Sequence, residues 1–327
     1  MPYYPPQPDH KPADHPPHKR IILRRMILCF FVLLTVYGVM CFIGYGADLI
    51  SLRQTTQELR EIASESSAFE TEPITAPPST EKPSTPSPPV SQPEETSALP
   101  DTLPEIEYPN GYNLVPRIRK LRKKSEYIIG WITMDDLDEP VALKDNDFFL
   151  NHDAMGKRNG NGAIFMDQGI SLMTRPYTIL LYGHNMKTGA MFGNLRKYEK
   201  FSYCYQHRIF QFDSLYEEGR YVVFAVSLVN LTPGRSKYLN LSAIQSTDRE
   251  TRQNAINALI KCSMHDIMLD VNEEDQLLLL ITCAGDDDER LIVAARRLRD
   301  GEKENSLTMK KQNEPAGLRG FYISIVI

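Results

Sequence analysis

Three residues whose types suit acyl-transfer chemistry stand at the ends of apolar, strand-like runs. The run "TILLYG" is followed by His184, and the run "LLLLITC" ends in Cys283. A third run, "RLIVAARRL", begins with Arg290 after a short acidic segment. A thiol becomes a strong nucleophile when a neighbouring imidazole takes or holds its proton, and a guanidinium stabilises a developing oxyanion. If these strand ends meet at one rim, the chain holds a nucleophile, an acid/base and an oxyanion donor.

The same residues also have purely structural explanations, which the pattern alone leaves open. A single cysteine that ends a buried strand is often a small core residue. A histidine in a loop is often a surface residue. Arg290 could pair with the acidic residues of the preceding segment, Asp286, Asp287 and Asp288.

Short apolar runs rich in β-branched and aromatic residues predict the strands that position these groups. They are "IIGWITM", "GAIFMD", "YTILLYG", "RIFQF", "RYVVFAVSLV", "QLLLLITC" and "RLIVAARRL". Helical spacing occurs in "AMFGNLRKYE" and in "TDRETRQNAINALIKCS", where Thr247 or Asp248 can cap the start. The alternation of strand and helix that builds a Rossmann sheet is absent, so we expect a mainly β barrel or sandwich of about 190 residues.

The folded region starts near Tyr112 with a short helix. Leu114, Ile118 and Leu121 recur at helical spacing, and Pro116 suits a first turn. The basic residues 117–124 are interpreted as the solvated face of this helix, with attraction to anionic envelope polymers as the alternative.

Residues 26–47 form an uncharged apolar stretch of about 22 residues, long enough for a helix to cross a bilayer. Basic residues precede it, which predicts a cytoplasmic N-terminus and an extracellular remainder. An uncleaved anchor is favoured over a cleaved signal peptide because the apolar core is long.

Residues 48–111 are expected to be an extracellular linker. Its start, residues 52–64, has some helical character, and the rest is crowded with Pro, Ser, Thr and Glu. Such a composition buries too little apolar surface to fold, and repeated prolines favour an extended spacer. The chain then divides into a cytoplasmic tail (1–25), a transmembrane helix (26–47), this linker, a folded domain (112–300) and a C-terminal tail of unassigned role (301–327). The N-terminal tail is interpreted as disordered rather than metal-binding.

Composition excludes two classes of protein. The net charge of −5 and the pI near 5.9 argue against a nucleic-acid-binding protein. Five cysteines, two of them in the apolar stretch, do not form a disulfide framework or a zinc-ribbon pattern.

Several motifs in order, over residues 113–299, resemble class B sortases, the cysteine transpeptidases of Gram-positive cell envelopes. They are "IIGWITMDD", "DNDFFLNHDAMGKRNGNGAIFMD", "LLYGHNMKTGAMFGNL" and "LLLLITC…ERLIVAARRL". The family's cysteine motif usually reads Thr-Leu-x-Thr-Cys, and here Leu279 replaces its first Thr. This departure concerns local packing more than chemistry.

The resemblance implies a fold and a set of roles. The fold would be a sortase-type closed β-barrel with an N-terminal helix and a long helix, residues 247–263, inserted between late strands. Cys283 would be the nucleophile, His184 the acid/base and Arg290 the oxyanion-stabilising residue. The substrate-binding residues would be Asn146, Leu150, Tyr182 and Thr282.

The resemblance also implies a reaction. The enzyme would cleave a C-terminal sorting signal of a secreted protein after Thr, form a thioester, and pass the acyl group to an amine of a peptidoglycan precursor. The alternatives are a pilin-polymerising sortase and a cell-wall cysteine peptidase that hydrolyses. No metal or organic cofactor is required, and the acidic residues 286–289 are interpreted as a solvated turn rather than a calcium site.

Two rival functions are distinguishable by sequence order and reactivity. In papain-like peptidases the cysteine opens a helix and precedes its histidine, whereas here His184 comes first and Cys283 closes a strand. An anchored surface-binding module without activity is the rival from another class, and the presence of all three polar residues argues against it.

Overall fold

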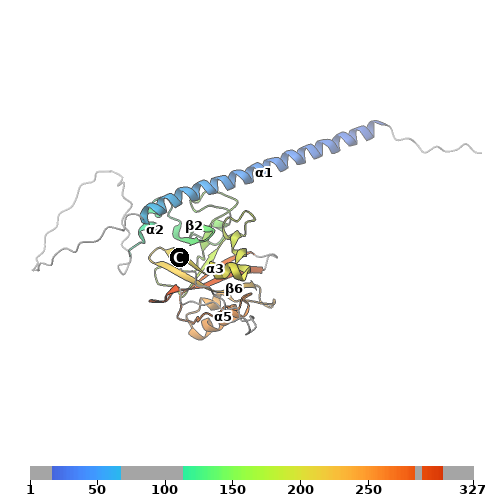
Figure 1. Ribbon diagram of the computed structural model, residues 1–327. Coiled ribbons are helices and arrows are strands. Elements are labelled where there is room, and N and C mark those ends of the chain that lie inside the picture. The colour runs from blue at the N-terminus through green and yellow to red at the C-terminus, as the bar shows by residue number, and fades with distance from the viewer. Residues whose placement is uncertain (1–16, 68–112, 284–288, 305–327) are drawn as a thin grey trace, which may run out of the picture. The chain divides into compact units, whose positions relative to one another are not determined.

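Eight strands close a barrel in the part of the chain that the computed structural model describes, which is residues 17–67, 113–283 and 289–304 (Figure 1). Around the barrel the order is β1-β2-β3-β4-β7-β8-β6-β5. The β2/β3 and β4/β7 pairs are parallel and the others antiparallel. The strands are β1 (Ile128–Met134), β2 (Leu137–Ala142), β3 (Ile164–Met166), β4 (Thr178–Tyr182), β5 (Ile209–Ser214), β6 (Glu218–Asn230), β7 (Leu277–Cys283) and β8 (Glu289–Arg297). The predicted closed barrel is confirmed.

Helices lie before the barrel and in its connections. They are α1 (Pro17–Ser67), α2 (Pro116–Arg122), η1 (Phe148–Leu150), η2 (Phe192–Glu199), α3 (Phe201–Gln206), α4 (Leu241–Ile244) and α5 (Arg249–Lys261). The inserted helix α5 follows β6 and precedes β7, as predicted. Of the two candidate caps, Asp248 performs the role: its side chain accepts a hydrogen bond from the Thr251 backbone N–H at 2.8 Å.

The central strands are apolar on both faces. In β7, Leu277 to Leu280 are fully buried, because one face lies in the barrel core and the helix η2 packs against this part of the barrel. A strand covered on both sides is an unbroken apolar run rather than an alternating one. Since β4 and β7 run parallel, their carboxyl ends meet at the same rim, and the antiparallel β8 begins there.

Strand β2 was not predicted. Its sequence, LDEPVA, contains two acids and a proline, all depleted in strands. The acids are accommodated by specific partners: Asp138 accepts a hydrogen bond from the Trp131 indole N–H at 2.6 Å, and Glu139 accepts one from the Thr56 hydroxyl at 3.0 Å.

Helix α1 carries the apolar stretch and, within the described residues, is the one helix long and apolar enough to cross a membrane. It continues beyond this stretch through residues 48–67, which were assigned to the linker. The chain divides into two compact units at Ser51, and residues 52–67 belong to the barrel's unit. Leu59 and Ala63 are fully buried in a cluster with Ile118 and Leu121 of α2.

Three predicted segments fall wholly or largely outside the described residues. They are most of the N-terminal tail, the linker from residue 68 onwards and the C-terminal tail from residue 305 onwards. Just before that tail, Glu302 forms an ion pair with the buried Arg296 at 2.7 Å.

Candidate active site

The strand register sets the positions of two predicted residues. Cys283 is the last residue of β7, and its backbone lies opposite that of Arg290 in β8. The side chain of Cys283 lies outside the described residues, as do the acids 286–288. Arg290 is half-buried, and its Nη1 donates a hydrogen bond to the Glu289 carbonyl oxygen at 3.0 Å.

A single cleft at this rim brings the other predicted residues together. Its volume is about 280 Å³. It is lined by Asn146, Leu150, Phe165, Tyr182, Gly183, His184, Leu231, Ile281, Thr282 and Arg290. Every predicted site residue except Cys283 is therefore in its wall, and Cys283 follows Thr282 directly in β7.

Two backbone contacts hold His184 in place. Its Nε2 lies 2.8 Å from the Leu150 carbonyl oxygen. A carbonyl only accepts, so Nε2 carries the hydrogen in this arrangement and does not serve as an acceptor. The His184 carbonyl in turn accepts from the Phe192 backbone N–H at 3.0 Å, which fixes the loop after β4.

Tyr182 and Asn146 meet at a carboxylate that sequence reasoning did not select. The Oδ2 of Asp167, just beyond the end of β3, accepts hydrogen bonds from the Tyr182 hydroxyl at 3.2 Å and from the Asn146 Nδ2 at 3.3 Å. Burial raises the pKa of Tyr182 well above its usual range, and the negative charge of Asp167 is the second cause. Tyr182 therefore stays a neutral phenol. The acid at the end of the predicted run "GAIFMD" was the available signal, although acids often occur where strands end in turns.

Thr282 and Leu279 differ in what surrounds them. The Thr282 side chain is buried in the cleft wall, and its hydroxyl has no hydrogen-bond partner among the described residues. Leu279, at the position that departs from the family motif, is fully buried, and its backbone lies between those of Leu180 and Ala294. The departure therefore falls in the packed wall of the barrel and not in the cleft.

The comparisons with known proteins agree with the fold. A family model described as the sortase domain matches residues 134–298, about half of the chain. The chain belongs to the sortase family. Sortase B of Listeria monocytogenes is 34% identical over 112 residues, which cover 33% of this chain and 46% of that protein. Sortase B of Staphylococcus aureus is 28% identical over 163 residues, which cover 48% of this chain and 67% of that protein.

Solved structures place this sortase in class B. A Bacillus anthracis protein described as similar to sortase B superimposes with a TM-score of 0.51 at 28% identity, covering 57% of this chain and 84% of that one. A Staphylococcus aureus sortase B–substrate complex gives a TM-score of 0.51 at 25% identity, covering 57% and 87%. The resemblance inferred from the motifs is confirmed.

The other cysteines of this sortase do not suit nucleophilic chemistry. Cys204 is fully buried, and burial raises the pKa of its thiol to about 12, so it stays protonated near neutral pH. Cys29 and Cys41 lie in the apolar part of α1, and Cys262 is the C-cap residue directly after α5. Among the described residues no group of three His, Cys, Asp or Glu side chains is placed to hold a metal ion.

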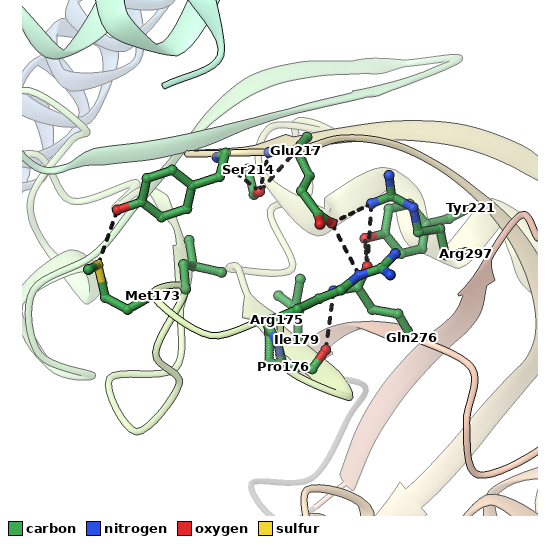
Figure 2. Close-up of a pocket in the computed structure, with 11 residues that line it drawn as sticks. Met173, Arg175, Pro176, Ile179, Ser214, Glu217, Tyr221, Gln276 and Arg297 are labelled. Carbon is green, nitrogen blue, oxygen red and sulfur yellow. Dashed lines mark hydrogen bonds and ion pairs between the residues drawn. The ribbon is translucent and has the colours of Figure 1, made fainter. Parts of the chain in front are cut away.

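Figure 2 shows a second cavity of this sortase, at the opposite ends of β4, β7 and β8. Its charged side chains pair with one another: Glu217 contacts Arg175 at 3.2 Å and Arg297 at 2.9 Å. None of the residues that line it is a cysteine or a histidine. The cleft at the His184 rim is therefore the candidate active site.

Proposed function

We propose that this class B sortase is a membrane-anchored cysteine transpeptidase in which Cys283 is the nucleophile, His184 the acid/base and Arg290 the oxyanion-stabilising residue. One observation carries the proposal: His184 and Arg290 line one cleft, and the register of β7 and β8 sets Cys283 opposite Arg290 at the same rim.

The reaction follows in two acyl transfers. The Cys283 thiolate adds to the carbonyl carbon of a threonine in the sorting signal, and Arg290 hydrogen-bonds the oxyanion. The peptide C–N bond breaks as His184 protonates the departing amine, which leaves a thioester. An incoming amine then attacks the thioester, gives up a proton to His184, and releases the thiolate with a new amide bond formed.

The histidine contact explains how the imidazole keeps its orientation through both steps. Because Nε2 is held by the Leu150 carbonyl, Nδ1 is the nitrogen that delivers and recovers the proton. Leu150 therefore lines the cleft, and its carbonyl oxygen orients the imidazole of His184.

Asn146, Leu150, Tyr182 and Thr282 are proposed to bind the sorting signal, since all four line the cleft beside His184. The buried Thr282 hydroxyl, without a partner among the described residues, is available for a hydrogen bond to the bound peptide. The Staphylococcus aureus homologue, which shares the fold, has been solved as a substrate complex, and this supports a substrate-binding role for the cleft.

The apolar part of α1 is proposed to anchor the enzyme, with the N-terminus cytoplasmic and the catalytic domain outside the cell. The length of the helix and the basic residues before its apolar stretch support this topology. The partners are then secreted proteins with a C-terminal sorting signal, and the acceptor amine of a peptidoglycan precursor, which gives surface-protein anchoring.

The test is a transfer assay on the ectodomain with a library of sorting-signal peptides and triglycine as the amine. Mass spectrometry is expected to show peptides cut after Thr and joined to triglycine. Cys283→Ala should abolish both products and His184→Ala nearly so, whereas the matched control Cys262→Ala should keep both. Full activity of Cys283→Ala would overturn the assignment, and cut peptides without joined product would identify a hydrolase.

A further inference from the structure

The two oxygens of the Asp167 carboxylate have separate contacts. Oδ1 accepts the Gly169 backbone N–H at 2.8 Å and so closes the turn after β3. Oδ2 accepts from the Tyr182 hydroxyl at 3.2 Å and from the Asn146 amide at 3.3 Å. One oxygen therefore serves the local turn, and the other joins two residues of the cleft wall.

The orientation of the Asn146 amide is fixed by a backbone group. The Gln168 N–H donates to Asn146 Oδ1 at 2.9 Å, and a backbone N–H only donates, so the oxygen and nitrogen of the amide cannot be exchanged. The nitrogen then faces Asp167 with one hydrogen and keeps its second hydrogen for another acceptor. Asn146 is thus set as a donor.

The orientation of the Tyr182 hydroxyl is fixed by the same carboxylate. A carboxylate only accepts, so the phenolic hydrogen is directed at Asp167 and the oxygen presents its lone pairs elsewhere. Tyr182 is thus set as an acceptor. A donor and an acceptor side by side match the C=O and N–H groups of an extended peptide backbone.

We propose that Asp167 is a positioning residue that fixes Asn146 as the donor and Tyr182 as the acceptor for the backbone of the bound sorting-signal peptide. This inference rests on the proposed function. Asp167 acts through its two neighbours and takes no part in the acyl transfer.

Asp167→Asn separates the two duties of the carboxylate. The amide oxygen still accepts the Gly169 N–H, but the NH₂ group that replaces Oδ2 cannot accept from Tyr182 or Asn146. We expect KM for a processed signal peptide to rise about tenfold while kcat changes less than about threefold, because an interaction with bound peptide is lost and the reacting groups stay in place.

The matched control is Asp145→Asn. Asp145 lies next to Asn146, and its Oδ1 caps the same loop by accepting the Asp147 and Phe148 backbone N–H groups at 3.1 and 2.7 Å. The amide oxygen of the variant preserves this contact, so KM should stay within about a factor of two of the wild-type value.

A cycle of variants distinguishes positioning from a merely structural role. The Tyr182→Phe/Asn146→Ala background lacks both groups through which Asp167 is proposed to act. Adding Asp167→Asn to it should therefore raise KM less than about twofold. If Asp167→Asn raised KM by the same factor in both backgrounds, Asp167 would act on the turn alone and the inference would be wrong. Tyr182→Phe by itself keeps the ring, and it should reproduce part of the increase in KM.

Peptide affinity separates failure of this inference from failure of the proposed function. In the Cys283→Ala ectodomain, fluorescence anisotropy of a labelled signal peptide reports binding without turnover. Weaker binding by Asp167→Asn supports the positioning role even if the wild type proves unable to transfer. Equal affinities with and without Asp167→Asn would overturn it, even if transfer by the wild type is fast.

Discussion

A thiol reacts as a nucleophile only where its surroundings favour the thiolate, and the cysteines of this chain differ in that respect. Cys204 lies in apolar packing, and burial raises its pKa to about 12. Cys283 stands at the end of a strand opposite the cationic Arg290. A cysteine side chain is thus a core residue at position 204, where it is surrounded by apolar groups, and the proposed nucleophile at position 283, where a cation lies opposite.

Arg290→Lys tests whether the guanidinium does more than supply charge. Lysine keeps the positive charge but loses the planar fork that can hold an oxyanion and the strand backbone together. We expect kcat/KM for peptide transfer to fall about 10- to 100-fold, measured by product formation under limiting peptide. Arg297→Lys, on the same strand but at the opposite rim, is the control and should stay within about twofold. An Arg290→Lys variant as active as the wild type would remove the proposed role.

For single residues, the sequence pattern indicated the three proposed reacting groups but not the residues that position the cleft wall. His184, Cys283 and Arg290 stand out because they are polar residues at the ends of apolar strands. Asn146 and Tyr182 were found only through resemblance to a family. Asp167 was missed because its role depends on two partners that are distant in the chain and close only in the fold.

The end of α1 and strand β2 form the most distinctive contact between elements. Glu139 of β2 accepts a hydrogen bond from Thr56, and its carboxylate lies 3.4 Å from Arg60. Burial nevertheless outweighs these contacts and raises the pKa of Glu139 to about 7. A buried carboxyl therefore lies between a helix and the barrel wall.

This raised pKa predicts a pH-dependent stability. The folded protein keeps the Glu139 proton up to about pH 7, whereas the unfolded chain loses it near pH 4.5, so the folded state binds more protons between these values. The free energy of unfolding then falls as pH rises through this window, by up to about 3 kcal/mol. Urea unfolding of the ectodomain at pH 5 and pH 8 should show a larger fall for the wild type than for Glu139→Gln.

The matched control for Glu139→Gln is Asp136→Asn. Lys197 holds the pKa of Asp136 below its usual value, so Asp136 titrates below pH 5 and its loss should leave the fall between pH 5 and pH 8 unchanged. A fall of the same size in Glu139→Gln and in the wild type would show that another group is responsible.

The end of α1 shows why the packing of a helix on the barrel can be missed when its apolar face is narrow. The buried positions Leu52, Thr56, Leu59 and Ala63 recur at helical spacing, but two of them are Thr and Ala, which give a weak apolar signal. Strand β2 was missed for a related reason, because its acids find partners on α1 and α2 that no local pattern reveals. By contrast, α2, α5 and the apolar strands follow from local pattern and capping.

For the molecule as a whole, the Pro-rich segment joins two parts of the same unit. The helical residues before it and α2 after it both pack on the barrel, and Lys124 near the end of α2 forms an ion pair with Glu58 of α1 at 3.0 Å. The described residues on both sides of this segment therefore belong to the barrel's unit. We therefore expect the length of the segment to have little effect on transfer by the membrane-bound enzyme, an expectation that composition alone did not give.

Shortening this segment tests the connectivity. Halving it within residues 70–109 should change the free energy of unfolding by only about 0.6 kcal/mol, because closure entropy depends weakly on loop length. Peptide transfer by the full chain in membranes should stay within about twofold. If the segment instead determined how far the catalytic domain extends from the membrane, transfer by the membrane-bound enzyme would fall with each shortening. Transfer by the soluble ectodomain would then be unaffected.

The intact mass of the ectodomain, taken after incubation with a processed signal peptide and no amine, tests the central claim most directly. We expect a covalent adduct equal in mass to the N-terminal part of the peptide, attached at Cys283, absent in Cys283→Ala and removed when triglycine is added. Peptide cleavage without any adduct at Cys283, or with an adduct at another residue, would contradict it.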